Sequence, residues 1–142
     1  MMKPIEHESS FDIRVTVTSD ADLVVARRKG RALAEQNGFS ASEATLVATA
    51  ISELARNIVS YAGSGEILVG KIDSANGLGI GVIARDRGPG IADTERAIRG
   101  GYSTSGGLGL GLPGVRRIMD EFDIASSPGK GTIVSIVKWK RR

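Results

Sequence analysis

The sequence contains no cysteine. This absence excludes a disulfide framework and any cysteine-ligated zinc or iron–sulfur site. Aromatic residues make up only 4% of the chain, so the core must be built largely from Ile, Val, Leu and Ala. Residues 1–20 hold no apolar stretch typical of a secretory signal, and no later stretch is long enough to span a membrane. We therefore expect a cytoplasmic protein that is not embedded in a membrane.

The net charge of +3 comes from the end of the chain. Lys138, Lys140, Arg141 and Arg142 fall within the last five residues. Without these four of the 19 basic residues, 15 remain against 16 acidic residues. A basic tail of this kind could contact phosphate or an acidic partner, but it is more often solvated. The charge therefore gives little support to nucleic-acid binding, and we expect no nucleic-acid partner.

Length and composition indicate one domain. The chain has 142 residues, of which 41% are hydrophobic and 25% charged, as is typical of a globular protein. Residues 1–10 are polar and without a period, so they are predicted to be a loose leader. Residues 11–142 are then expected to form the single domain.

Hydrophobic periodicity predicts the first half of this domain. Apolar and polar residues alternate from Phe11 to Val17, as in a half-buried strand. A helix capped by Asp20 or Asp22 is expected to run to about Asn37, with Gly38 as its stop.

A second helix is predicted from a capping-box spacing. Ser40 and Glu43 have the positions that such a box requires. Apolar residues then recur at three- and four-residue steps from Leu46 to Ile58, and Gly63 ends the segment.

The second half contains more strand than helix. Residues 66–72 and 78–85 are rich in Ile and Val and should pair as a hairpin around a turn at 73–77. A short helix is expected over 112–122, followed by a strand near Ile124 and a last strand over 132–137. The predicted class is α/β, with a mixed sheet covered by helices on one face.

Seven glycines fall within fifteen positions between Gly100 and Gly114. A glycine-rich loop that leads into a helix offers backbone N–H groups to phosphate. The run from Gly109 to Gly114 fits the dinucleotide pattern G-x-G-x-x-G, but no strand precedes it and no suitably placed acidic residue follows. A complete Walker A loop and the HRD and DFG motifs of eukaryotic-type kinases are also missing. The common nucleotide folds are therefore disfavoured.

Polar residues at two other places narrow the class of site. Glu53 and Asn57 lie four residues apart and share one face of the predicted second helix. A carboxylate and a carboxamide placed side by side can divide proton acceptance and magnesium coordination between them. Asp86 ends an apolar strand just before a tight turn with Gly88 and Gly90. Its carboxylate, if oriented there, could accept a hydrogen bond from an amino group of a ligand.

In combination these motifs resemble those of the GHKL ATPases, and within them the anti-sigma-factor type of serine/threonine switch kinase found in stressosomes. Segment 52–57 (SELARN) is similar to the N box and segment 86–90 (DRGPG) to the G1 box. Segment 106–111 (GGLGLG) resembles the G2 lid and segment 129–132 (GKGT) the G3 turn. The order and spacing of the four motifs span 52–132, most of the chain, so the match is more specific than any single motif.

The resemblance implies a Bergerat-type α/β sandwich that binds ATP with Mg²⁺. Glu53 would be the general base and Asn57 the magnesium ligand. Asp86 would accept a hydrogen bond from the adenine amino group, with Thr132 in the same network. The remaining implied nucleotide contacts are in the turn and the lid: Gly88, Gly90, Ile91, Ser105, Gly106, Gly107, Leu108, Gly109, Leu110 and Gly111.

The implied activity is phosphorylation of a STAS-domain scaffold or antagonist protein in a bacterial stress-signalling partner switch. A kinase released from this partner would then activate a serine phosphatase by binding. A nucleotide-gated anti-sigma factor that sequesters its target is the alternative, since both would share the ATP site. Glu53 favours catalysis because a pure binding protein needs no base. Ser52 stands where sensor kinases often have histidine, which disfavours a phosphohistidine mechanism.

Overall fold

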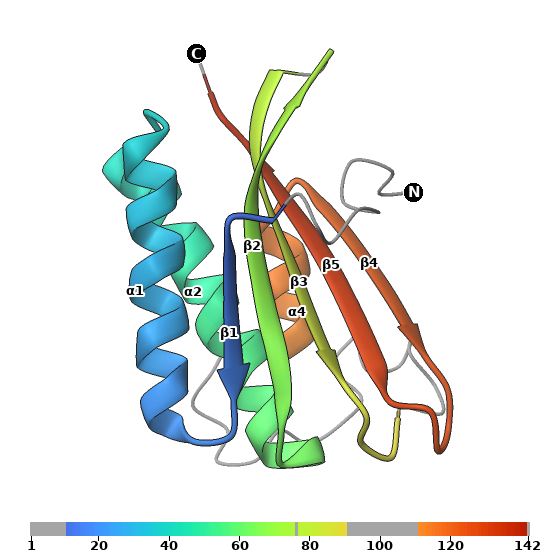
Figure 1. Cartoon of the computed structure of the whole chain (residues 1–142). Coiled ribbons are helices and arrows are strands. Elements are labelled where there is room, and N and C mark those ends of the chain that lie inside the picture. The colour runs from blue at the N-terminus through green and yellow to red at the C-terminus, as the bar shows by residue number, and fades with distance from the viewer. Residues whose placement is uncertain (1–10, 76, 91–110, 142) are drawn as a thin grey trace.

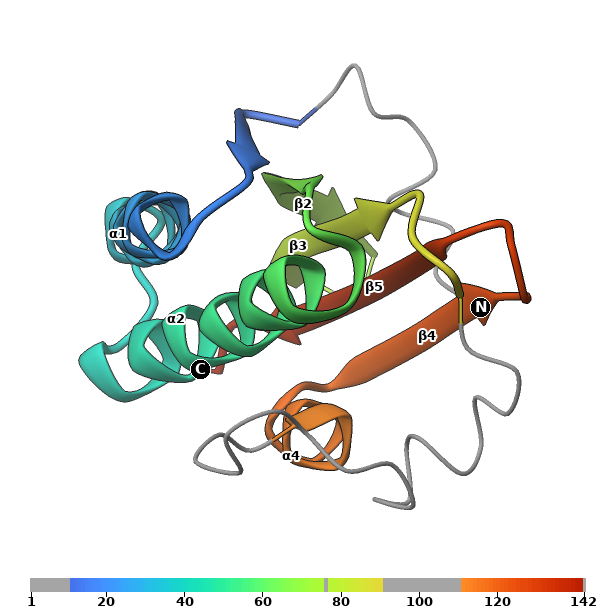
Figure 2. The same cartoon turned by 90° about the horizontal axis from the view of Figure 1, so that it is seen from below.

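The computed structural model describes residues 11–75, 77–90 and 111–141. They form a layer of β-sheet and a layer of helices that lie on one face of that sheet (Figure 1). Seen from below, α1, α2 and α4 lie along this one face (Figure 2). The predicted class, a sheet with helices packed on one side, is confirmed. None of the described helices is long and apolar enough to cross a bilayer.

Two long helices follow the first strand, as predicted. Helix α1 spans Asp20–Gln36 and α2 spans Ala41–Asn57. The capping box of α2 is complete, because the Ser40 hydroxyl accepts the Glu43 N–H while the Glu43 carboxylate accepts the Ser40 N–H. The N-cap of α1 is Ser19 rather than an aspartate. Asp22 instead accepts hydrogen bonds from Thr18 and Ser19, which fixes the entry of the chain into α1.

The sheet has five strands in the order β1-β2-β3-β5-β4. Their bounds are β1 Ile13–Val17, β2 Gly65–Ser74, β3 Gly77–Asp86, β4 Glu121–Ser126 and β5 Thr132–Trp139. The predicted mixed sheet is wrong in one respect, since every pairing among these strands is antiparallel. The pairs β2–β3 and β4–β5 are hairpins, which impose antiparallel neighbours. The pairs β1–β2 and β3–β5 are antiparallel as well, although no hairpin joins their strands.

The helix predicted over 112–122 is shorter than expected. Helix α4 spans Gly111–Ile118, and the strand β4 already begins at Glu121. Phe122 and Ile124 alternate inward from β4 and pack on the core that α4 also covers. Pairing with β5 therefore decides the conformation of residues 121–122, because ladder hydrogen bonds outweigh a weak local helix preference.

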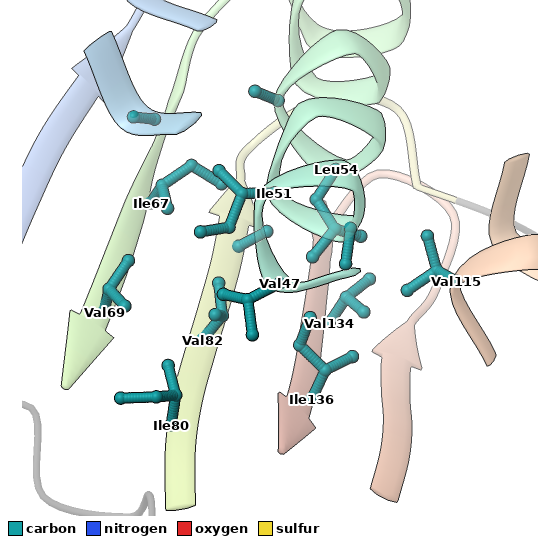
Figure 3. Close-up of a cluster of buried hydrophobic side chains, with 14 of the residues drawn as sticks. Val47, Ile51, Leu54, Ile67, Val69, Ile80, Val82, Val115, Val134 and Ile136 are labelled. Atoms are coloured by element: carbon teal, nitrogen blue, oxygen red, sulfur yellow. The ribbon is translucent and has the colours of Figure 1, made fainter. Parts of the chain in front are cut away.

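The main core lies between the sheet and the helices. Figure 3 shows Ile51 and Leu54 of α2 among inward side chains of the strands, and Val115 of α4 belongs to the same cluster. Ile51 is fully buried, and truncating such a side chain typically costs about 2–5 kcal/mol. Gly30 lets α1 approach α2, because a Cβ at this position would overlap the side chain of Ile51.

A smaller apolar cluster covers the other face of the sheet. Its buried members are Leu68, Ile72, Ile83 and Val137, with Phe11 and Trp139 packed against them. Sequence alternation placed Phe11 on the same face as Ile13, and this prediction is wrong. Phe11 precedes β1 and packs over Gly70, which is free of a side chain that would obstruct it.

Part of the basic C-terminal segment is built into the fold and is not the solvated tail that was expected, whereas Lys140 and the side chain of Arg141 are exposed. Lys138 is only 7% exposed, and its ammonium donates to the carbonyl of Ile118 at the end of α4. Arg141 donates its backbone N–H to Glu43 and its guanidinium to Asp120. These contacts join the start of α2 and the end of α4 to the last strand.

Candidate nucleotide-binding site

The C-terminal end of α2 contributes the first two predicted site residues. Glu53 is buried, with 7% of its surface exposed, and Asn57 is half-buried as the last residue of α2. A π-helical turn over Ile58–Ala62 follows at once and ends at Gly63, which has a φ of 84°. π-Helical turns are rare and are frequent at functional sites. The structure thus puts Asn57 at the junction of two helix types, not in the middle of a regular helix.

The carboxylate of Glu53 is held on both oxygens. Its Oε1 accepts the backbone N–H of Gly111 at 3.0 Å, although 58 positions separate the two residues. Its Oε2 is paired with the guanidinium of Arg56, one turn further along α2. The N box and the last residue of the predicted lid are therefore in direct contact. In this structure the partner of the Arg56 guanidinium is therefore Glu53.

The second part of the site is the end of β3. The carboxylate of Asp86 is half-buried and accepts the N–H of Gly88 at 2.8 Å. Thr132, the first residue of β5, lies directly opposite Asp86 in the antiparallel ladder. On the other side Asp86 pairs with Gly65, where a Cβ would lie 3.1 Å from the Cβ of Asp86. The sequence analysis did not identify Gly65 as part of this site.

The predicted G1 and G3 turns are packed backbone against backbone. Gly129 donates its N–H to the carbonyl of Pro89 at 2.7 Å. A Cβ on Gly90 would overlap the carbonyl of Ser127, and one on Gly131 would overlap the carbonyl of Asp86. Both glycines also have a positive φ, 79° and 80°. Glycine is thus required at these two positions by conformation and by space.

The same turn meets the end of the second helical segment. A Cβ on Gly88 would lie 2.6 Å from the Cβ of Ala62 in the π-helical turn. The structure therefore brings four predicted motifs to one end of the sheet: the N box, the G1 turn, the G3 turn and the end of the lid at Gly111. Ile91 and the lid residues Ser105, Gly106, Gly107, Leu108, Gly109 and Leu110 lie outside the described residues.

The family of the chain is shown by comparison with known proteins. The model of the family described as histidine kinase-, DNA gyrase B- and HSP90-like ATPases matches residues 42–142. The chain is 46% identical over 127 residues to the serine/threonine-protein kinase RsbT of Bacillus subtilis strain 168, covering 89% of this chain and 96% of RsbT. It is 32% identical over 120 residues to the anti-sigma F factor of Thermoanaerobacter sp. strain X514, covering 80% of this chain and 82% of that protein.

A solved structure supports the architecture. The crystal structure of the RsbU and RsbW domains of a Mycobacterium tuberculosis protein matches with a TM-score of 0.65 and 18% identity, over 92% of this chain and 32% of that one. Our chain thus spans about a third of that longer chain, and at this identity the likeness speaks for the fold alone. Together with the family match, the chain belongs to the GHKL ATPases, as the motifs between Ser52 and Thr132 predicted.

Proposed function

We propose that this protein is a serine/threonine protein kinase that transfers the γ-phosphoryl group of ATP to a hydroxyl of a partner protein. The observation that carries the proposal is the buried, doubly held carboxylate of Glu53 beside the nucleotide end of the sheet. A protein that only binds its partner needs no base at this place, whereas phosphoryl transfer to a hydroxyl needs a proton acceptor.

The residues at the site fit magnesium–ATP. The half-buried carboxylate of Asp86 is an oriented acceptor for an amino group, and the turn that follows it is fixed by close packing of Gly88 on Ala62 and of Gly90 on Ser127. Asn57 offers a side-chain oxygen, the type of ligand that magnesium prefers. When bound, magnesium–ATP supplies the phosphoryl group and neutralises its charge.

The chain itself would orient the base and receive the proton. Arg56 and the N–H of Gly111 each hold one oxygen of Glu53, which leaves the carboxylate a narrow range of orientations. The incoming serine or threonine hydroxyl would give its proton to this carboxylate as the new O–P bond forms and the bond from the γ-phosphorus to ADP breaks, so that ADP leaves. Ser52 is turned away from this chemistry, because its hydroxyl donates to the carbonyl of Ala48 within α2 at 3.0 Å.

We propose a STAS-domain scaffold or antagonist protein as the substrate, in a partner switch in which the released kinase binds and activates a serine phosphatase. The similarity to RsbT over nearly its whole length supports this assignment. The similarity to anti-sigma F factors supports the alternative, in which the protein acts mainly by sequestering a sigma factor.

Incubation with labelled ATP, magnesium and candidate STAS proteins, followed by mapping of the phosphorylated residue, tests the proposal. We expect label on serine or threonine with the wild-type chain and almost none with Glu53→Gln. The alternative predicts tight sigma-factor binding in the presence of ATP without labelling of any STAS protein. A phosphohistidine is lost in acid, whereas phosphoserine and phosphothreonine survive. Label that is lost on acid treatment would therefore contradict the proposed chemistry.

A further inference from the structure

The two oxygens of the Glu53 carboxylate differ in how they can be reached. Oε1 accepts the N–H of Gly111 at 3.0 Å in a buried hydrogen bond. Oε2 is paired with the guanidinium of Arg56, and this contact is only partly buried. The side chain of Glu53 is 9% exposed, whereas that of Arg56 is 41% exposed. The more open way to the carboxylate is therefore toward Oε2, on the side where Arg56 lies.

The guanidinium of Arg56 is held by few contacts. Arg56 is in the last turn of α2, where the helix C-terminus favours a cation. Its Nη1 makes the contact with Glu53, and no other partner of this guanidinium is found among residues 11–75, 77–90 and 111–141. An arginine side chain is long and flexible. Arg56 can therefore leave the carboxylate by rotation of its side chain, without a change in the backbone of α2.

The position of Arg56 affects any group that would give a proton to Glu53. A hydroxyl must come within about 2.6–3.2 Å of the oxygen that takes its proton. Because Arg56 lies on the open side of Oε2, an incoming hydroxyl has to displace the guanidinium or share the oxygen with it. Water brings no charge that could replace Glu53 as the partner of Arg56. A protein substrate can bring a carboxylate beside its hydroxyl, and a guanidinium–carboxylate pair is a strong, charge-assisted contact.

We propose that Arg56 is a positioning residue that withholds Glu53 from water and releases it to the hydroxyl of a protein substrate with an acidic group nearby. Arg56 thus selects between two acceptors of the γ-phosphoryl group. In hydrolysis, the oxygen of water bonds to the γ-phosphorus, the bond to ADP breaks, and a proton of water goes to Glu53. In transfer, a serine or threonine oxygen takes the place of water, while the acidic group of the substrate holds Arg56. The inference rests on the proposed function in one respect, namely that Glu53 is the base.

Two rates measured on the same purified proteins test this inference: ATP hydrolysis without a partner, and phosphorylation of a STAS protein. Arg56→Met keeps an apolar stem and removes the charge. Its hydrolysis rate should rise about 3- to 10-fold, the equivalent of one hydrogen bond, while phosphorylation of the partner stays within about threefold of wild type. Arg56→Gln also removes the charge and should raise hydrolysis in the same direction, which provides a second variant if Arg56→Met is poorly folded.

Two further variants are the controls. Arg56→Lys keeps a cation beside Glu53 and should restore slow hydrolysis. Arg31→Met breaks the pair of Arg31 with Glu35 on α1, in which both side chains are about half exposed, and should change neither rate. Denaturant unfolding shows that each variant is folded under the assay conditions. Hydrolysis that is unchanged or slower in both folded variants without the charge would contradict the inference.

A double variant and a binding measurement separate this role from others. If Arg56 acts through Glu53, the combination of Glu53→Gln with Arg56→Met should hydrolyse ATP as slowly as Glu53→Gln alone. Fast hydrolysis by the double variant would contradict the inference. Calorimetry that finds weaker binding of ATP but not of ADP to Arg56→Met would make Arg56 a ligand of the γ-phosphate, which overturns the inference and leaves the proposed function in place. Partner phosphorylation by Glu53→Gln at the wild-type rate would instead overturn the role of Glu53 in the proposed function.

Discussion

Helix α2 buries two glutamates, and their surroundings differ at its two ends. Glu43 in the first turn and Glu53 near the last are 8% and 7% exposed. Glu43 accepts the backbone N–H groups of Ser40 and Arg141, which belong to the regular framework. Glu53 is paired with a half-buried arginine and with Gly111, where the predicted lid ends. Similar burial thus accompanies a structural role at one end and a candidate catalytic role at the other.

The electrostatics of Glu43 fit a structural role. Burial raises the pKa of Glu43, but the N–H groups of Ser40 and Arg141 and the Ser40 hydroxyl outweigh it, so the pKa lies below its usual range. Nearby Lys138 lowers it further. A carboxylate that is stabilised in its charged form by fixed backbone donors contributes to folding.

The largest effect that separates the two ends is expected from Glu53→Gln. This substitution keeps the size of the side chain and removes the proposed base, so phosphoryl transfer should fall about 10²- to 10⁴-fold. Magnesium–ATP affinity should stay within about threefold of wild type, a change of under 1 kcal/mol, because the groups that would contact the adenine remain. Transfer to the partner and calorimetric ATP binding measure the two quantities. Glu43→Gln is the matched control and should transfer the phosphoryl group at the wild-type rate. If Glu53→Gln also transfers at the wild-type rate, the general-base hypothesis is wrong.

The next effect concerns the turns that pack against each other at the end of the sheet where we propose that the nucleotide binds. Gly131→Ala forces a positive φ on alanine, at about 1–2 kcal/mol, and pushes a methyl group into the Asp86 carbonyl. Overpacking adds typically about 1–3 kcal/mol, so the total loss should be roughly 2–5 kcal/mol. Gly129 has a similar φ of 79°, and among the described residues a glycine-to-alanine substitution there brings no neighbouring atom within 4 Å of the new methyl, so Gly129→Ala should cost only the conformational part. Denaturant unfolding of both variants measures the difference, and equal losses would show that the close approach is unimportant.

A smaller effect is expected at Asp86. Asp86→Asn keeps the shape and replaces one acceptor oxygen by a donor, so magnesium–ATP affinity should fall about 10- to 100-fold, or about 1.5–3 kcal/mol. The free energy of unfolding should change little, because the Gly88 N–H can still be accepted by the remaining oxygen. Calorimetry and denaturant unfolding give the two values. Undiminished ATP affinity in this variant would argue that another group reads the base.

The smallest effect is a pH dependence at the framework end of α2. Because its folded pKa is lowered, Glu43 stabilises the fold above its unfolded pKa, about 4.3, and this contribution is lost as the pH falls through the lower folded value. Glu43→Gln should therefore lower the free energy of unfolding by about 1–3 kcal/mol at pH 7. The difference from wild type should shrink below about pH 4. Denaturant unfolding between pH 3 and 7 measures it, and a gap that is constant over this range would rule out the proposed linkage.

Local patterns determined much of this protein. The capping box at Ser40, the apolar stripe of α2 and the stop at Gly38 are short-range features, and each formed where the sequence predicted it. The four motifs between residues 52 and 132 also predicted the GHKL family, since their order and spacing survive in the linear sequence.

Tertiary structure decided the rest, because long-range contacts competed with local preference. Residues 121–122 became strand through pairing with β5, and Phe11 moved to the opposite face by packing over Gly70. Lys138 is buried because its ammonium donates to a carbonyl at the end of α4. The sequence of a basic tail gives no sign of such a long-range contact. The contact between Glu53 and Gly111 depends on a side chain and a backbone N–H brought together across 58 positions. Sequence identifies the residues that can perform this chemistry, and only the fold fixes which donor faces which acceptor.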